Sequence, residues 1–340
     1  MLKKILVLTF TICAATSCDS DISGPSSSQN SEFKITAADG AVGDFFGYSV
    51  SISGDYAVVG AIGDDDNGDE SGSAYIFRRT GTSWAQEAKL FASDGAVNNF
   101  FGESVSISGD YAVVGAYLDD DNGDESGSAY IFKRTGTSWA LDAKLLALDG
   151  AAFDNFGESV SISGDHIIVG ALGDDYHGSA SGSVYIFKNT GTSWALETKL
   201  LASDGAAFDN FGESVSISDD YAVVGAYLDD DNGDRSGSAY IFKRTGRDWA
   251  LEAKLLPLDG AAVDKFGYSV SISGDFAVVG AQSGSAYVFK RSDTSWVQEA
   301  KLVPSDGAVN NSFGNSVSIS GDFVVVGAQS GTAYVYNGII

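Results

Sequence analysis

The chain has 340 residues, of which 46 are acidic and 20 are basic, so its net charge is −26. This charge repels phosphate groups and therefore excludes nucleic acid and anionic membrane surfaces as partners. Hydrophobic residues make up 44% of the chain and aromatic residues 12%. Disordered acidic proteins lack such apolar content, so we expect a packed core.

The first 31 residues have the features of a bacterial export signal. Lys3 and Lys4 precede an apolar run over 5–15, which is too short to span a bilayer as a mature helix. The small residues before Cys18 resemble a lipobox, in which cleavage before the cysteine is coupled to lipidation of its thiol. The alternative is an ordinary secretory signal cleaved nearby. We expect a signal peptide over 1–17, and then lipidated Cys18 with a Ser-rich tether over 18–31.

Lipidation at Cys18 predicts a location in the bacterial cell envelope, at the outer membrane or the cell surface. The protein would then contact the membrane only through its lipid anchor. The other cysteine, Cys13, lies inside the apolar run and is removed with the signal. Disulfides and thiol catalysis are therefore not expected in the mature chain.

Internal repetition dominates residues 32–340. The phrase Phe-Gly, followed by Ser-Val-Ser-Ile-Ser and Val-Val-Gly-Ala, recurs with small changes in six units, at Gly47, Gly102, Gly157, Gly212, Gly267 and Gly314. The interval between these glycines is 55 residues four times and then 47. The last interval is shorter because unit five lacks an acidic loop that units one to four carry, and unit six lacks it too.

Each unit contains four predicted strands, which in unit one cover 49–53, 56–60, 73–77 and 84–90. The first strand alternates small polar and apolar residues with period two. Gly-Asp, Asp-Asn-Gly and Thr-Gly-Thr sequences between the strands are turn signals. Four strands in about 50 residues are typical of a propeller blade.

The two ends of the repeat region are complementary. Residues 32–41 match 87–96 and so supply a lone fourth strand, whereas the C-terminal unit stops after its third strand. We predict an all-β, six-bladed propeller of four-stranded antiparallel blades over 32–340. The N-terminal outer strand would pair with the C-terminal blade and close the ring. A seven-bladed ring is the alternative, but it requires a further unit that these residues lack.

The repeated motifs identify the chain as a member of the FG-GAP repeat family. Its repeats form the blades of the integrin α-subunit head and recur in secreted bacterial proteins. The resemblance covers 32–340 and implies a propeller, but it leaves function open because propellers host binding, adhesion and catalysis. The motif position that is usually Pro holds Ile62 here, and other residues in the sister units.

The acidic loops are the candidate metal sites. Ca²⁺ takes six to eight oxygen ligands, and a glycine allows the sharp turn that gathers them. The family resemblance implies Ca²⁺ in Asp-x-Asp-x-Asp-Gly loops. The candidate ligands are Asp64, Asp65, Asp66, Asn67 and Asp69 in unit one, Asp119, Asp120, Asp121, Asn122 and Asp124 in unit two, and Asp229, Asp230, Asp231, Asn232 and Asp234 in unit four.

The register of these loops departs from the calcium pattern. Counting back from Gly68, the first ligand position holds Gly63 rather than an aspartate. The working hypothesis is weak Ca²⁺ binding, and the alternative is a solvated hairpin tip. The blade topology places these loops on one face with the Asp-Gly-Ala turns at Asp39 and its repeats, so that face is predicted to attract cations or a basic partner.

Catalysis is not expected. The two histidines, His166 and His177, lack a recognisable partner nucleophile, and His166 stands where other units have an aromatic packing residue. We predict a non-enzymatic binding or adhesion module for a protein or glycan ligand at the cell surface. A glycan-active, carboxylate-dependent hydrolase at the propeller channel is one alternative, and a structural envelope protein is another. The oligomeric state stays open.

Overall fold

The computed structural model describes residues 33–293, 295–306, 312–329 and 331–339. Among these residues there are 23 strands and no helix, arranged as six antiparallel sheets. The predicted signal peptide, Cys18 and tether lie outside the described residues. No helix in the described residues is long and apolar enough to cross a membrane.

The sheets follow the repeat, and each is called a blade below. Blade one contains β1 (Val50–Ser53), β2 (Tyr56–Ala61), β3 (Ser73–Thr80) and β4 (Ser83–Leu90). Blade two contains β5 (Val105–Ser108), β6 (Tyr111–Ala116), β7 (Ser128–Thr135) and β8 (Ser138–Leu145). Blade three contains β9 (Phe156–Ser163), β10 (His166–Ala171), β11 (Ser183–Asn189) and β12 (Trp194–Leu200).

The second half of the chain repeats this order. Blade four contains β13 (Phe211–Ser218), β14 (Tyr221–Ala226), β15 (Ser238–Thr245) and β16 (Asp248–Leu255). Blade five contains β17 (Phe266–Ser273), β18 (Phe276–Ala281), β19 (Ser285–Ser292) and β20 (Ser295–Leu302). Blade six contains β21 (Ser316–Ser320), β22 (Phe323–Ala328) and β23 (Thr332–Asn337).

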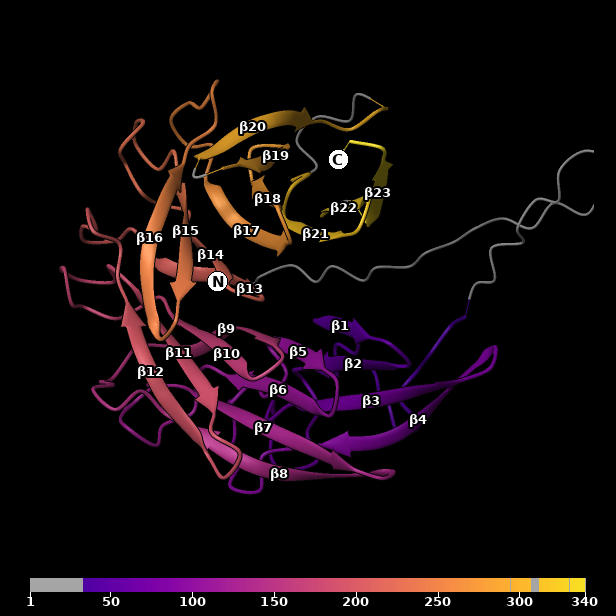
Figure 1. The fold of residues 1–340 in the computed structure, drawn as a ribbon. Helices are drawn as coiled ribbons and strands as arrows, with labels where there is room; N and C mark the ends of the chain where they lie inside the picture. Colours follow the sequence, from indigo (N-terminus) through magenta and orange to yellow (C-terminus); the bar gives the residue numbers. More distant parts are fainter. Residues whose placement is uncertain (1–32, 294, 307–311, 330, 340) are drawn as a thin grey trace, which may run out of the picture.

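The blades are arranged around a centre as a six-bladed propeller (Figure 1). In blades one to five the first strand lies innermost and the fourth lies outermost. The all-β, six-bladed prediction is confirmed. The core lies between blades, where Val58 and Ile76 of blade one form one buried cluster with Val105 of blade two. Within blade two, Phe101 is fully buried and packs edge-on against Tyr130 and Phe132. Later blades repeat this contact.

The repeated glycines lie where neighbouring blades meet. A Cβ added to Gly115, in the Val-Val-Gly-Ala phrase of blade two, would lie 1.9 Å from the carbonyl oxygen of Gly157. Gly157 belongs to the Phe-Gly phrase of blade three and has a φ of 100°. Side chains at these two positions would therefore force the blades apart, and this explains why both phrases keep their glycine.

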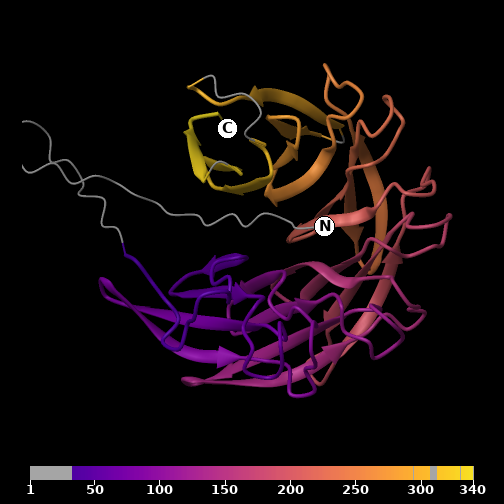
Figure 2. The same ribbon diagram turned by 180° about the vertical axis from the view of Figure 1, so that it is seen from behind.

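The predicted closing strand differs from the structure. Residues 33–37 form no strand, and β23 pairs only with β22 among the described residues. In both views the N-terminal segment, in indigo, runs beside blade one and away from β23 (Figure 2). Ile35 and Ala37 pack on blade one, as Leu90 and Ala92 pack on blade two. The segment therefore contacts blade one as the outer strand of a preceding blade would, although it forms no strand and does not pair with β23.

The outer faces of the two end blades are less covered than the inner junctions. Val50 and Ile52 of blade one are exposed, whereas their equivalents Val105 and Ile107 are buried against blade one. Phe323 and Val335 of blade six are also exposed. The same repeat positions are therefore core or surface according to whether a neighbouring blade covers them.

Candidate functional site

The acidic loops connect the second and third strands of blades one to four. In blade one, the carbonyl of Asp64 accepts hydrogen bonds from the Gly72 backbone N–H at 2.9 Å and from Ser71 Oγ at 3.2 Å. The carboxylate of Asp65 accepts one from the Glu70 backbone N–H at 2.8 Å. Gly68 has a φ of 134°, which suits glycine. These local contacts make a closed loop.

The candidate ligands of each loop fall into two groups. The first aspartate of the loop is buried: Asp64, Asp119 and Asp229, with Asp174 in blade three. The remaining candidates are exposed, namely Asp65, Asp66, Asn67 and Asp69, Asp120, Asp121, Asn122 and Asp124, and Asp230, Asp231, Asn232 and Asp234. The structure therefore does not gather the five residues of one loop around a common point.

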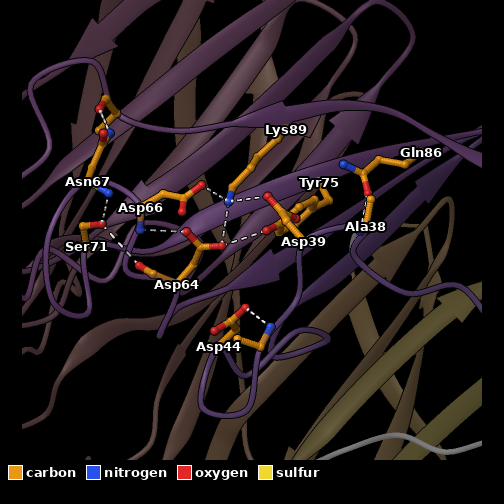
Figure 3. A network of polar contacts seen from close by, with 12 residues as sticks. Ala38, Asp39, Asp44, Asp64, Asp66, Asn67, Ser71, Tyr75, Gln86 and Lys89 are labelled. Atoms are coloured by element: carbon orange, nitrogen blue, oxygen red, sulfur yellow. Dashed lines mark hydrogen bonds and ion pairs between the residues drawn. The ribbon is translucent and has the colours of Figure 1, made fainter.

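A lysine ammonium lies between the carboxylates that do converge. Lys89 on β4 places its Nζ 2.8 Å from Asp64, 2.6 Å from Asp66 and 2.9 Å from Asp39 (Figure 3). Asp39 belongs to the Asp-Gly-Ala turn before blade one, so the predicted meeting of the acidic loops and these turns on one face is confirmed. We call this arrangement the lysine clasp.

The lysine clasp recurs in blades two to four. In blade two, Lys144 Nζ lies 2.8 Å from Asp94, 3.2 Å from Asp119 and 2.6 Å from Asp121. In blade four, Lys254 contacts Asp204, Asp229 and Asp231. Each clasp joins a loop, an outer strand and the preceding inter-blade turn, so it ties neighbouring blades together.

Blade three has a variant of the lysine clasp. Lys199 Nζ lies 2.7 Å from both Asp149 and Asp174. Tyr176 stands where blades one, two and four carry the exposed aspartate, and the lysine lies 5.6 Å from the centre of its ring. A cation–π contact therefore replaces an ion pair, which preserves the attraction to the ammonium.

A buried tyrosine completes each clasp. Tyr75 donates its hydroxyl to Asp64 at 2.7 Å, and the Lys89 ammonium lies 5.2 Å from the ring centre. Tyr130 in blade two hydrogen-bonds both Asp119 and Asp94, at 2.7 and 3.0 Å. The hydroxyl satisfies an oxygen that burial removes from water.

Electrostatics in the blade one clasp favour the ion pairs. Burial acts to raise the pKa of Asp64, but the hydrogen bonds from Lys89 and Tyr75 outweigh it, so the net pKa is lowered. Burial likewise acts to lower the pKa of Lys89, but its carboxylate partners raise it well above its usual range. Both groups therefore stay charged at neutral pH.

The remaining loop candidates serve other contacts. Asp120 and Asp230 repeat the backbone hydrogen bond of Asp65. Asn122 donates from Nδ2 to the Ala147 carbonyl at 2.8 Å, which fixes the loop to the following turn. Sequence reasoning missed the lysines, although their fixed place before a leucine in the fourth strand of units one to five was a usable signal.

The predicted calcium sites stay a prediction. Within the residues that the structure describes, no three histidine, cysteine, aspartate or glutamate side chains gather as a metal site. The aspartates that do converge hold a lysine ammonium, which places one positive charge where a calcium ion would place two. A calcium ion at this place would therefore have to compete with the lysine for the same carboxylates.

His166 occupies an aromatic packing position, as expected. It is buried and contacts Trp249 edge-on at 6.2 Å, as Tyr56 contacts Trp139 at 6.0 Å. Its Nδ1 lies 2.7 Å from Asp165, and its Nε2 lies 3.3 Å from Glu197. Burial lowers the pKa of His166. The residue borders a cavity of about 400 Å³ whose lining includes Asp219, Asp220 and Arg244.

The repeat motifs match a known family along most of the chain. Six segments fit the FG-GAP repeat, at residues 30–77, 84–132, 139–187, 194–242, 249–289 and 296–336. The chain belongs to the FG-GAP repeat family. The FG-GAP phrases are those whose glycines bring neighbouring blades into backbone contact. No curated protein matches the chain.

Proposed function

We propose that this FG-GAP propeller is a non-enzymatic binding module, and that its ligand-binding side is the face built from the acidic loops and the inter-blade turns. We call it the acidic face. The proposal rests on the difference between the aspartates of each loop. The first aspartate is buried and pairs with the lysine of the clasp, whereas Asp65, Asp69 and their repeats are exposed. A clasped loop presents these carboxylates on a fixed support.

A non-enzymatic role is supported by the way the acids follow the repeat. In each of four successive blades, the first aspartate of the loop contacts the lysine of the fourth strand. Catalytic carboxylate pairs need different environments, with one acid held neutral and the other charged. The clasp aspartates repeat one environment, which suits a surface that binds along its length.

We also propose that binding does not require Ca²⁺, because each clasp carries its own ammonium. A close cluster of carboxylates needs a cation to offset repulsion, and the lysine meets that need. Anchoring to the envelope through Cys18 is proposed on the signal sequence alone. Its test is the Cys18→Ala variant, which should be released from membranes; full membrane retention would contradict it.

The binding proposal is tested by neutralising the exposed acids of the acidic face. Variants Asp65→Asn, Asp120→Asn and Asp230→Asn are combined, and binding of fluorescent polylysine is measured at low and physiological salt. We expect a marked loss of affinity. The matched control removes three exposed acids of the first-to-second strand turns, with Asp55→Asn, Asp110→Asn and Asp275→Asn. An equal loss in both variants would overturn the assignment to the acidic face.

A further inference from the structure

Large apolar side chains are exposed at one repeated position of the inter-blade turns. Phe153, Phe208 and Val263 are 55%, 62% and 48% exposed, before blades three, four and five. Blades one and two carry Gly43 and Asn98 at this position. The turns before blades three and five add exposed Leu148 and Leu258. Apolar groups of this size are stabilising only when something covers them.

The backbone at these positions adds a second cost. The φ angles of Phe153, Phe208 and Val263 are 70°, 73° and 70°. This left-handed region is unfavourable for bulky and β-branched residues and suits Gly or Asn. The blade fold is built with Gly43 and Asn98 at the same position, so folding does not explain the bulky residues.

The backbone at these three positions is hydrogen-bonded directly to the acidic loops. The Phe153 backbone N–H donates to the Asp124 carbonyl at 2.8 Å, and Val263 donates to the Asp234 carbonyl at 2.7 Å. Phe208 donates to Ser179 in the blade three loop at 2.7 Å. The side chains of Asp124 and Asp234 are exposed. An exposed apolar residue is therefore hydrogen-bonded through its backbone to an exposed aspartate before blades three and five, and to Ser179 of the blade three loop before blade four.

We propose that this part of the acidic face, defined by Phe153, Phe208, Val263 and the neighbouring loop carboxylates, binds a cationic amphipathic polypeptide segment. The inference rests on the proposed binding function and names its partner class. Lysine or arginine side chains would pair with the exposed carboxylates, and aliphatic or aromatic side chains would cover the apolar ones. A second copy of the chain is disfavoured because its net charge is −26.

The experiment compares two fluorescent peptides on the full chain: an amphipathic peptide of alternating lysine and leucine pairs, and polylysine of equal charge. The test variant combines Phe153→Asn, Phe208→Asn and Val263→Asn, which place the blade two residue at each position. Amphipathic-peptide affinity should fall at least about tenfold, and polylysine affinity should change little. The melting temperature should hold or rise, because asparagine tolerates the left-handed backbone.

The matched control is Leu141→Gln with Leu251→Gln, which removes exposed apolar groups from outer strands and introduces the residue found at Gln86. It should leave both affinities unchanged. The partner class would be overturned if the test variant bound the amphipathic peptide as tightly as the native chain, or if the control lost as much affinity. Polylysine binding in that case would still support binding at the acidic face. If neither peptide bound to the native chain, both proposals would be overturned. A native dimer that the test variant abolishes would identify a second copy as the occupant instead.

Discussion

Blades two and five share a fold but differ in one loop, and the difference isolates what the acidic loop does. Lys144 in blade two meets three carboxylates, and its side chain is 16% exposed. Lys301 in blade five pairs with one carboxylate among the residues that the structure describes, Asp259 of the turn, at 2.7 Å, and is 36% exposed. Strand pairing between the second and third strands is the same in both blades. The loop therefore adds a clasp and a surface to a blade that forms without it.

The largest effect is expected from removing the lysine of a complete clasp. Lys144→Met leaves buried Asp119 beside two other carboxylates without their cation, so we expect a loss of about 3 kcal/mol in unfolding free energy. The control is Lys301→Met, which breaks a single surface pair and should cost at most about 1 kcal/mol. Urea unfolding measures both. Equal losses would show that the clasp adds nothing to the surface pair.

A loop exchange should cost less than loss of the lysine. Residues 117–126 of blade two are replaced by Gln-Ser, the connection that blade five uses at Gln282 and Ser283. Asp119 leaves with the loop, so no buried carboxylate stays unpaired, and we expect a loss of about 1–2 kcal/mol. Circular dichroism should still show an all-β protein. Collapse of the fold would contradict the independence of blade and loop.

Replacing a buried acid next to the clasp of blade three, Asp154, should increase the stability of the protein. Burial raises the pKa of Asp154 to about 6, against the hydrogen bond from Ala151, and the charge of Asp174 adds to the shift. The folded state then holds a proton that the unfolded state releases near pH 4, so stability is lost as the pH rises through about 6. Blade two carries Asn99 at this position.

Asp154→Asn should therefore gain about 1 kcal/mol at pH 8 and nothing at pH 4. Urea unfolding at both pH values gives the comparison. Asp264→Asn is the control, because the blade that follows it lacks an acidic loop, and its gain should be smaller. A gain that is the same at both pH values would refute the titration of Asp154 as its source.

The smallest effect is expected from calcium. With the clasps filled by lysine, the melting temperature of the native protein should stay unchanged between chelator and millimolar Ca²⁺. Magnesium at the same concentration controls for ionic strength. A rise specific to calcium would restore the metal-site hypothesis for these loops.

The sequence by itself determined the blade, the blade count and the family. Strand period, turn glycines and the 55-residue interval are local properties, and each is repeated often enough to exclude chance. The shared face of the acidic loops and the Asp-Gly-Ala turns also followed from strand order alone. The role of His166 as a packing residue was predictable because the other units carry tyrosine or phenylalanine at the equivalent position.

Only the tertiary structure decided what the acidic loops contain. Lys89 lies 23 residues beyond Asp66 and 50 beyond Asp39 in sequence, and their contact depends on two strands and a turn folding back to one point. A run of aspartates predicts a cation, because like charges repel. The identity of that cation depends on distances between side chains in the folded chain, which the sequence pattern does not contain. The same holds for Val50 and Val105, whose different burial is set by the presence or absence of a covering blade.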